Sequence, residues 1–143
     1  MTPGMIQVPD LSDLIGLPFK DGGTGLGGAN PGGYDCYGLA REVFSRFGIA
    51  LPAINISVIA CRQASQQEID AHARRLWERI PMPTVPCGVQ ITSCDQRYAN
   101  HIATHIGYGK IIHITLKSRV AIQRLGDYAN RVEGFYRYVG PAR

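Results

Sequence analysis

The sequence predicts an α+β domain in which N-terminal helices pack on a C-terminal antiparallel β-meander of about five strands. Two segments with helical spacing of apolar residues come first, within residues 36–80. Short runs rich in β-branched and aromatic residues follow from about residue 88. Helices that precede all the strands are typical of α+β proteins, whereas a parallel βαβ fold would alternate the two.

The first helix is predicted directly after a glycine-rich loop. Residues 21–33 hold seven of the 17 glycines, a density that sustains neither helix nor strand. A helix over about 36–47 follows, and Gly48 stands where a glycine often ends a helix. Its apolar positions recur at helical spacing: Leu39, Ala40, Val43, Phe44 and Phe47.

A second helix is predicted over about 66–80, after an apolar connector at 51–60. Ser65 and Glu68 form the signature of a capping box at its start. Prolines at 81, 83 and 86 end it. Its apolar stripe is formed by Ile69, Ala73, Leu76, Trp77 and Ile80.

The predicted β-meander covers about 88–139. Turn residues such as Gly107-Tyr108-Gly109 separate the runs, so neighbouring strands are expected to pair in antiparallel fashion. The five predicted strands lie at 89–93, 101–106, 111–116, 120–125 and 135–139.

Composition limits the classes of protein to consider. A chain of 143 residues suits one domain, here 1–143, and its hydrophobic fraction of 45% can supply a core. The net charge of +4 suits contact with an anionic polymer. The basic residues form no run and do not interleave with aromatic side chains, so no nucleic-acid partner is predicted.

The sequence predicts neither membrane insertion nor a secretory signal. No strongly apolar stretch approaches the roughly 18 residues of a membrane span. Residues 1–10 lack the basic start and apolar centre of a signal peptide, so synthesis in the cytoplasm is expected.

Two apparent ligand motifs are discounted, and no cofactor is predicted. Residues 23–28 match the dinucleotide fingerprint GxGxxG, but the helix that should open there begins only at about 36. Cys87, Cys94 and His101 follow one another at intervals of seven, which is too loose a pattern to predict a metal site. The four cysteines contain no Cys-x-x-Cys pair.

Cys36 is the candidate nucleophile. It follows the glycine-rich loop and opens the first helix, with Asp35 as a plausible N-cap. The unpaired N–H groups and the helix dipole at this position favour a thiolate. The alternative interpretation is a small buried residue that fills the first helical turn.

Two histidines supply the base that such a nucleophile needs. His101 lies on one predicted strand, and His113 lies twelve residues later on the next, across the turn at 107–109. An antiparallel return can place these two side chains next to each other. A thiol, a base and a group that orients the base are the parts of a cysteine-dependent catalytic site.

The blocks around these residues resemble the NlpC-type cell-wall peptidases, which are papain-like cysteine peptidases, and the phage-tail branch most closely. The resemblance is carried by three segments: Tyr34-Asp35-Cys36-Tyr37-Gly38-Leu39-Ala40-Arg41-Glu42-Val43, His101-Ile102-Ala103-Thr104-His105-Ile106-Gly107 and Lys110-Ile111-Ile112-His113. The closing Glu133-Gly134-Phe135-Tyr136-Arg137-Tyr138 adds to it, so that it runs from about residue 14 to 139.

The resemblance implies a papain-like NlpC-type fold and a catalytic triad. Cys36 would be the nucleophile, His101 the base and then the acid, and His113 the group that orients His101. Asp35 would hold the free amine of a peptidoglycan stem peptide. Phe19 and Tyr37 stand where many members carry Tyr and Ser, which implies an altered substrate pocket.

The expected activity is hydrolysis of stem-peptide amide bonds, between D-glutamate and the diamino acid, by a phage tail-associated enzyme acting at the cell envelope. Its partners would be stem peptides and phage tail-tip proteins. Two alternatives use the same residues differently. One is acyl transfer or amidase chemistry at the Cys-His-His site, and the other is a non-catalytic tail-tip module that binds cell wall.

Overall fold

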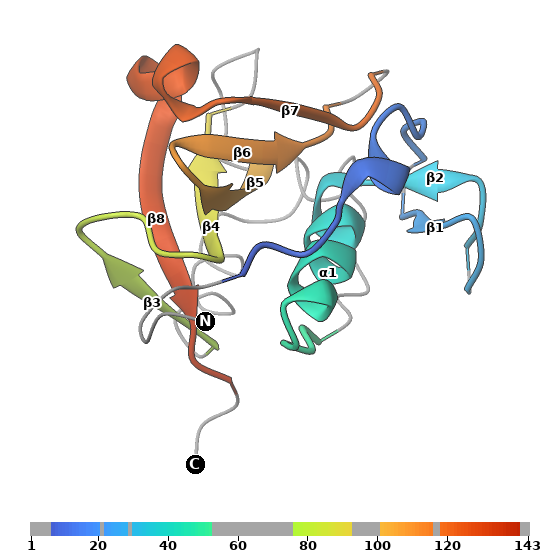
Figure 1. The fold of residues 1–143 in the computed structure, drawn as a ribbon, viewed down its shortest axis with the longest axis horizontal. Coiled ribbons are helices and arrows are strands. Elements are labelled where there is room, and N and C mark those ends of the chain that lie inside the picture. Colours follow the sequence, from blue (N-terminus) through green and yellow to red (C-terminus); the bar gives the residue numbers. More distant parts are fainter. Residues whose placement is uncertain are drawn as a thin grey trace.

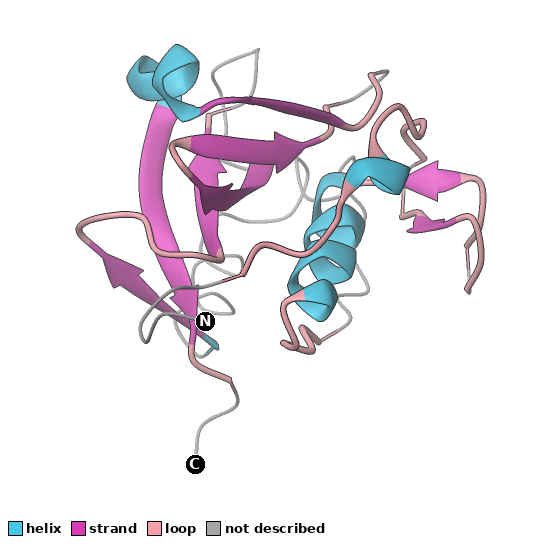
Figure 2. Ribbon diagram, viewed as in Figure 1, coloured by secondary structure: helices cyan, strands magenta, loops and turns pink. Residues whose placement is uncertain are grey.

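The computed structural model describes residues 7–20, 22–28, 30–52, 76–92, 101–115 and 118–140. A large sheet with one α-helix beside it dominates this part of the chain, and a small hairpin lies at the far side of the helix (Figures 1 and 2). In chain order the elements are η1 (Ser12–Leu14), β1 (Thr24–Gly25), β2 (Gly33–Tyr34), α1 (Cys36–Arg46), β3 (Trp77–Ile80), β4 (Cys87–Ile91), β5 (His101–Gly107), β6 (Lys110–His113), β7 (Ala121–Arg124), η2 (Leu125–Arg131) and β8 (Val132–Tyr138).

Both ends of α1 are fixed by local hydrogen bonds. Asp35 is extended and its Oδ1 accepts from the N–H of Gly38 at 2.6 Å, which satisfies one of the unpaired donors of the first turn. At the other end Gly48 has a φ of +85°, and the N–H of Ile49 donates to the carbonyl of Phe44 at 2.9 Å. The helix therefore stops one residue short of the predicted range of 36–47.

The large sheet has six antiparallel strands in the order β3-β8-β4-β5-β6-β7. Strands β4 to β7 are successive neighbours, as in a meander. Strand β8 does not follow β7 but returns to pair with β4, because the seven residues of η2 carry the chain back across the sheet. The predicted meander of about five strands is wrong in the position of its last strand and in the number of strands.

The sixth strand comes from a segment predicted to be helical. Trp77–Ile80 form β3 and pair with β8, although the prediction placed them at the end of a helix over about 66–80. The Trp77 ring lies edge-on to Phe44 of α1 and to Tyr138 of β8, with centroid distances of 5.6 and 5.3 Å. These tertiary contacts outweigh the local helical pattern. The predicted helix up to residue 75 lies outside the described residues.

The two faces of β5 belong to two different layers of the core. Ile102 and Ile106 pack with side chains of α1 on one face. Ala103 packs on the other face with β4, β6 and β8. Because side chains alternate along a strand, His101 and His105 share the face of Ala103. The histidines therefore lie on the side of the sheet turned away from the body of α1.

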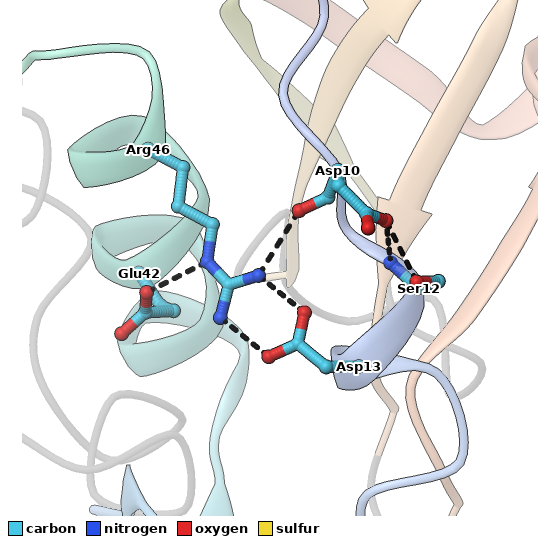
Figure 3. Close-up of polar contacts among 5 residues, drawn as sticks. All are labelled: Asp10, Ser12, Asp13, Glu42 and Arg46. Atoms are coloured by element: carbon cyan, nitrogen blue, oxygen red, sulfur yellow. Dashed lines mark hydrogen bonds and ion pairs between the residues drawn. The ribbon is translucent and has the colours of Figure 1, made fainter.

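Arg46 fastens the N-terminal segment to α1 (Figure 3). Its guanidinium Nη1 and Nη2 contact the two carboxylate oxygens of Asp13 at 2.5 and 2.8 Å, and Nη1 also donates to the main-chain oxygen of Asp10 at 3.1 Å. Nε donates to Glu42, one turn earlier, at 2.9 Å. This forked geometry suits arginine and not lysine.

Among the described residues, no helix is both long and apolar enough to cross a membrane.

Candidate active site

Cys36 is the first residue of α1, and only 4% of it is exposed. The cap formed by Asp35 starts the helix at this residue, so the Cys36 thiol lies where the helix dipole favours negative charge. Cys36 thus lies at the start of the helix, as the sequence predicts, and Asp35 makes the predicted N-cap contact.

The glycine-rich segment lies directly against the first turn of α1. A Cβ added to Gly38 would come within 2.2 Å of the carbonyl oxygen of Gly23. Thr24 and Gly25 form β1, which pairs with β2 just before Cys36. The glycines therefore allow the backbone of this segment to approach the start of the helix more closely than any side chain would permit.

His101 and His113 are in direct contact. Nε2 of His101 lies 2.9 Å from Nδ1 of His113, and the ring centroids are 5.1 Å apart. The antiparallel register pairs Thr104 with Ile112, which places Ala103 opposite His113. His101 is two residues before Ala103, so it lies diagonally across from His113 and not directly opposite it. The sequence predicted that these side chains would be neighbours, and the structure brings them together by this diagonal.

Burial keeps both imidazoles neutral. His101 is 8% exposed and His113 4%. Burial, together with nearby His113 and Arg131, lowers the pKa of His101 to about 3. Burial also lowers the pKa of His113, although the hydrogen bond to Gln123 acts in the opposite direction. Each ring is therefore uncharged at neutral pH, with a hydrogen on one nitrogen and a lone pair on the other, the form in which His101 can accept a proton.

Sequence reasoning missed three residues beside this pair: Gln123, Tyr128 and Arg131. Gln123 Oε1 lies 2.5 Å from Nε2 of His113 and accepts from the Tyr128 hydroxyl at 2.5 Å. The guanidinium of Arg131 lies over the Tyr128 ring, 5.4 Å from its centroid. The available signal was the predicted strand at 120–125, where Gln123 is a polar residue on the strand next to His113.

Two of the predicted substrate-binding residues are engaged in structural contacts. The Tyr37 hydroxyl donates to the carbonyl of Pro52 at 2.6 Å, and burial raises its pKa to about 12. Phe19 is half-buried, forms a bridge with Tyr34 and packs against the core cluster that α1 shares with β5 and β6. Neither contact joins these side chains to the histidine pair.

Other nucleophiles and metal ligands were also considered within the described part of the chain. Cys87 is fully buried opposite His105, and burial raises the pKa of its thiol, so it remains an unreactive core residue. No three His, Cys, Asp or Glu side chains gather there in a way that could hold a metal ion. Cys94 lies outside the described residues.

The solved structures that are similar to this chain include the following two. One is a Staphylococcus aureus protein described as similar to a lipoprotein of the NLP/P60 family, with a TM-score of 0.55 and 19% identity over 87% of this chain and 37% of its own. The other is NlpC2 from Trichomonas vaginalis, with a TM-score of 0.54 and 16% identity over 89% of this chain and 44% of its own.

These similarities assign an NlpC-type fold to the chain. The chain spans less than half the length of either protein. No protein-family model and no curated protein matches the sequence.

Proposed function

We propose that this chain is a cysteine peptidase that hydrolyses amide bonds in the stem peptides of peptidoglycan, with Cys36 as nucleophile. The observation that carries the proposal is the buried contact between His101 Nε2 and His113 Nδ1 at 2.9 Å. A neutral imidazole held by a second polar group is the base that a cysteine nucleophile requires. The NlpC-type fold supports the same activity.

The proposal brings Cys36 and His101 together at the ends of their elements. Cys36 is the first residue of α1 and His101 the first residue of β5, and α1 packs against both β5 and β6. In Figure 1 the arrowhead of β6, the end that carries His113, points toward the end of α1 next to β2. The proposal requires His101 to reach this helix terminus from the face of β5 opposite the one that α1 covers.

The reaction follows from these roles. The Cys36 thiol gives its proton to His101, and the thiolate attacks the amide carbonyl to form a C–S bond. The N–H of Cys36 and a neighbouring donor hold the oxyanion. His101 returns its proton to the departing amine as the C–N bond breaks. Water, deprotonated by His101, then cleaves the thioester and restores the thiol. His113 keeps His101 in place throughout.

The substrate and setting are further parts of the proposal. The bond would be the one between D-glutamate and the diamino acid, and Asp35 would hold the free amine of the stem peptide while it also caps α1. The net charge of +4 favours approach to an anionic cell wall. We propose a phage tail-associated hydrolase, made in the cytoplasm, that reaches the envelope with the particle and contacts tail-tip proteins.

The test is mass spectrometry of purified peptidoglycan fragments incubated with the protein. A new fragment should form with the unmodified protein and with Cys87→Ala, the matched control at a buried thiol away from α1. It should be absent with Cys36→Ala, because without the thiolate no thioester forms. An added amine acceptor separates hydrolysis from acyl transfer by the mass of the product. Cleavage retained in a folded Cys36→Ala variant would refute the proposal.

A further inference from the structure

A third side chain continues the histidine pair across the sheet. Gln123 of β7 pairs with Ile111, two residues before His113 on β6. Residues two apart on a strand share a face, so Gln123 lies on the same face as His113, one diagonal step away. A similar diagonal step leads from His113 to His101. The register of three neighbouring strands thus aligns the three side chains.

The direction of the hydrogen bonds along this row is fixed at one end. The Oε1 atom of Gln123 only accepts, so Nε2 of His113, 2.5 Å away, carries the hydrogen. A neutral imidazole protonated at Nε2 has its lone pair on Nδ1. That atom lies 2.9 Å from Nε2 of His101, which therefore donates in turn. The lone pair of His101 is then on Nδ1.

Tyr128 lies against both Gln123 and His113. Its hydroxyl donates to the same Oε1 at 2.5 Å. Its ring meets the His113 ring edge-on, with centroids 5.2 Å apart and planes 86° from parallel. Rotation of the amide by half a turn would place its NH2 group against both the phenol and the imidazole. Nε2 of His113 would then have to accept, and the hydrogen positions along the row would be reversed.

We propose that Gln123, with its amide oxygen hydrogen-bonded to Tyr128, is a positioning residue that fixes the tautomers of His113 and His101 and so makes Nδ1 of His101 the atom that accepts the Cys36 proton. The role of Cys36 rests on the proposed function. The tautomers do not, since they follow from the contacts among the three side chains.

Nitrogen-15 NMR of the whole labelled protein at pH 7 tests the tautomers directly. Both His101 and His113 are expected to carry their hydrogen on Nε2. A hydrogen on Nδ1 of either ring would overturn the proposal. Because this measurement needs no substrate, the proposal stands if the tautomers are as expected but peptidoglycan is not cleaved, and only the proposed function then fails.

Two variants at position 123 separate positioning from packing. Gln123→Leu removes the acceptor, so the Nδ1–H form of His113 should appear and kcat should fall by about 10–100-fold with little change in KM. Gln123→Glu keeps an acceptor in the same place and should retain the tautomers and most of kcat. Its negative charge should raise the pKa of His113, and so move the acidic limb of the pH–rate profile to higher pH.

Arg124→Leu is the matched control on the same strand, since Arg124 is exposed and pairs with Asp127. It should change neither the tautomers nor the rates. Equal rates and unchanged tautomers in the Leu and Glu variants at position 123 would contradict the proposal.

Discussion

Asp35 caps α1 and, in the proposed function, also binds the substrate. Its carboxylate accepts from the N–H of Gly38, and the proposal also gives it the amine of the stem peptide. Asparagine caps a helix about as well as aspartate but carries no charge. Substitution can therefore separate the two roles.

We expect Asp35→Asn to leave the free energy of unfolding within about 1 kcal/mol of the unmodified protein, and to raise KM for peptides with a free amine. Asp35→Ala should lose about 0.5–2 kcal/mol of stability, because the cap itself is lost. Urea denaturation and steady-state kinetics on amine-bearing and acetylated peptides give both quantities. An unchanged preference for the free amine in Asp35→Asn would assign Asp35 to capping alone.

The position of Cys36 at a helix start, the cap by Asp35 and the contact between the two histidines were predictable, because each follows from patterns within one element or one tight hairpin. A cap residue, a helix start and alternation along a strand each depend on a few neighbouring positions. Gln123 was missed because its contact depends on the register of β6 with β7, which its own flanking residues do not specify. The resemblance placed Tyr37 in the substrate pocket; in the structure its hydroxyl donates to the carbonyl of Pro52, fifteen residues away.

At the scale of the element, the start of α1 depends on a close approach of two backbones. The ideal Cβ of an alanine at position 38 would lie 2.2 Å from the Gly23 carbonyl oxygen and 2.9 Å from the capping oxygen of Asp35. Alanine gains about 1 kcal/mol over glycine in a helix interior. The steric cost should exceed that gain, because a backbone oxygen cannot rotate aside as the end of a side chain can.

Gly38→Ala is therefore expected to lower the free energy of unfolding by about 1–3 kcal/mol. Gly126→Ala is the control, since a new Cβ there meets no atom within 4 Å. Chemical denaturation of both variants decides the sign. A Gly38→Ala protein more stable than the unmodified chain would mean that the glycine-rich segment shifts freely away from α1.

The element types were predictable where the pattern was long or strongly periodic, as for α1 and for β5. Strand β3 was not, because Trp77 and Ile80 are three residues apart and suit one face of a helix equally well. Its pairing with β8 and the packing of Trp77 against Phe44 and Tyr138 are formed by residues far apart in the sequence. The order of strands in the sheet depends on the same kind of contact.

At the scale of the whole molecule, the buried histidines couple stability to pH. His101 has a pKa of about 3 in the folded protein, against about 6.5 in an unfolded chain. Between these values the unfolded state binds the extra proton, so stability falls as the pH decreases below about 6.5. The lowered pKa of His113 acts in the same direction.

The free energy of unfolding should therefore decrease from pH 7 to pH 5, with a slope that approaches about 1.4 kcal/mol per pH unit from His101 and a further contribution of the same sign from His113. Urea denaturation at several pH values measures this slope. The variant His101→Gln lacks one of the titrating groups and should show a shallower dependence. A stability that is constant or that increases toward pH 5 would contradict the burial of both rings in neutral form.

The interior position of β8 has a consequence for synthesis on the ribosome. Strand β3 pairs only with β8 within the large sheet, and β8 also covers the free edge of β4. While Val132–Tyr138 are still inside the ribosome, β3 therefore has no neighbouring strand and one edge of β4 is unpaired. Until those residues emerge, the half-made sheet is open to association with other chains, and chaperone binding would matter most in that interval.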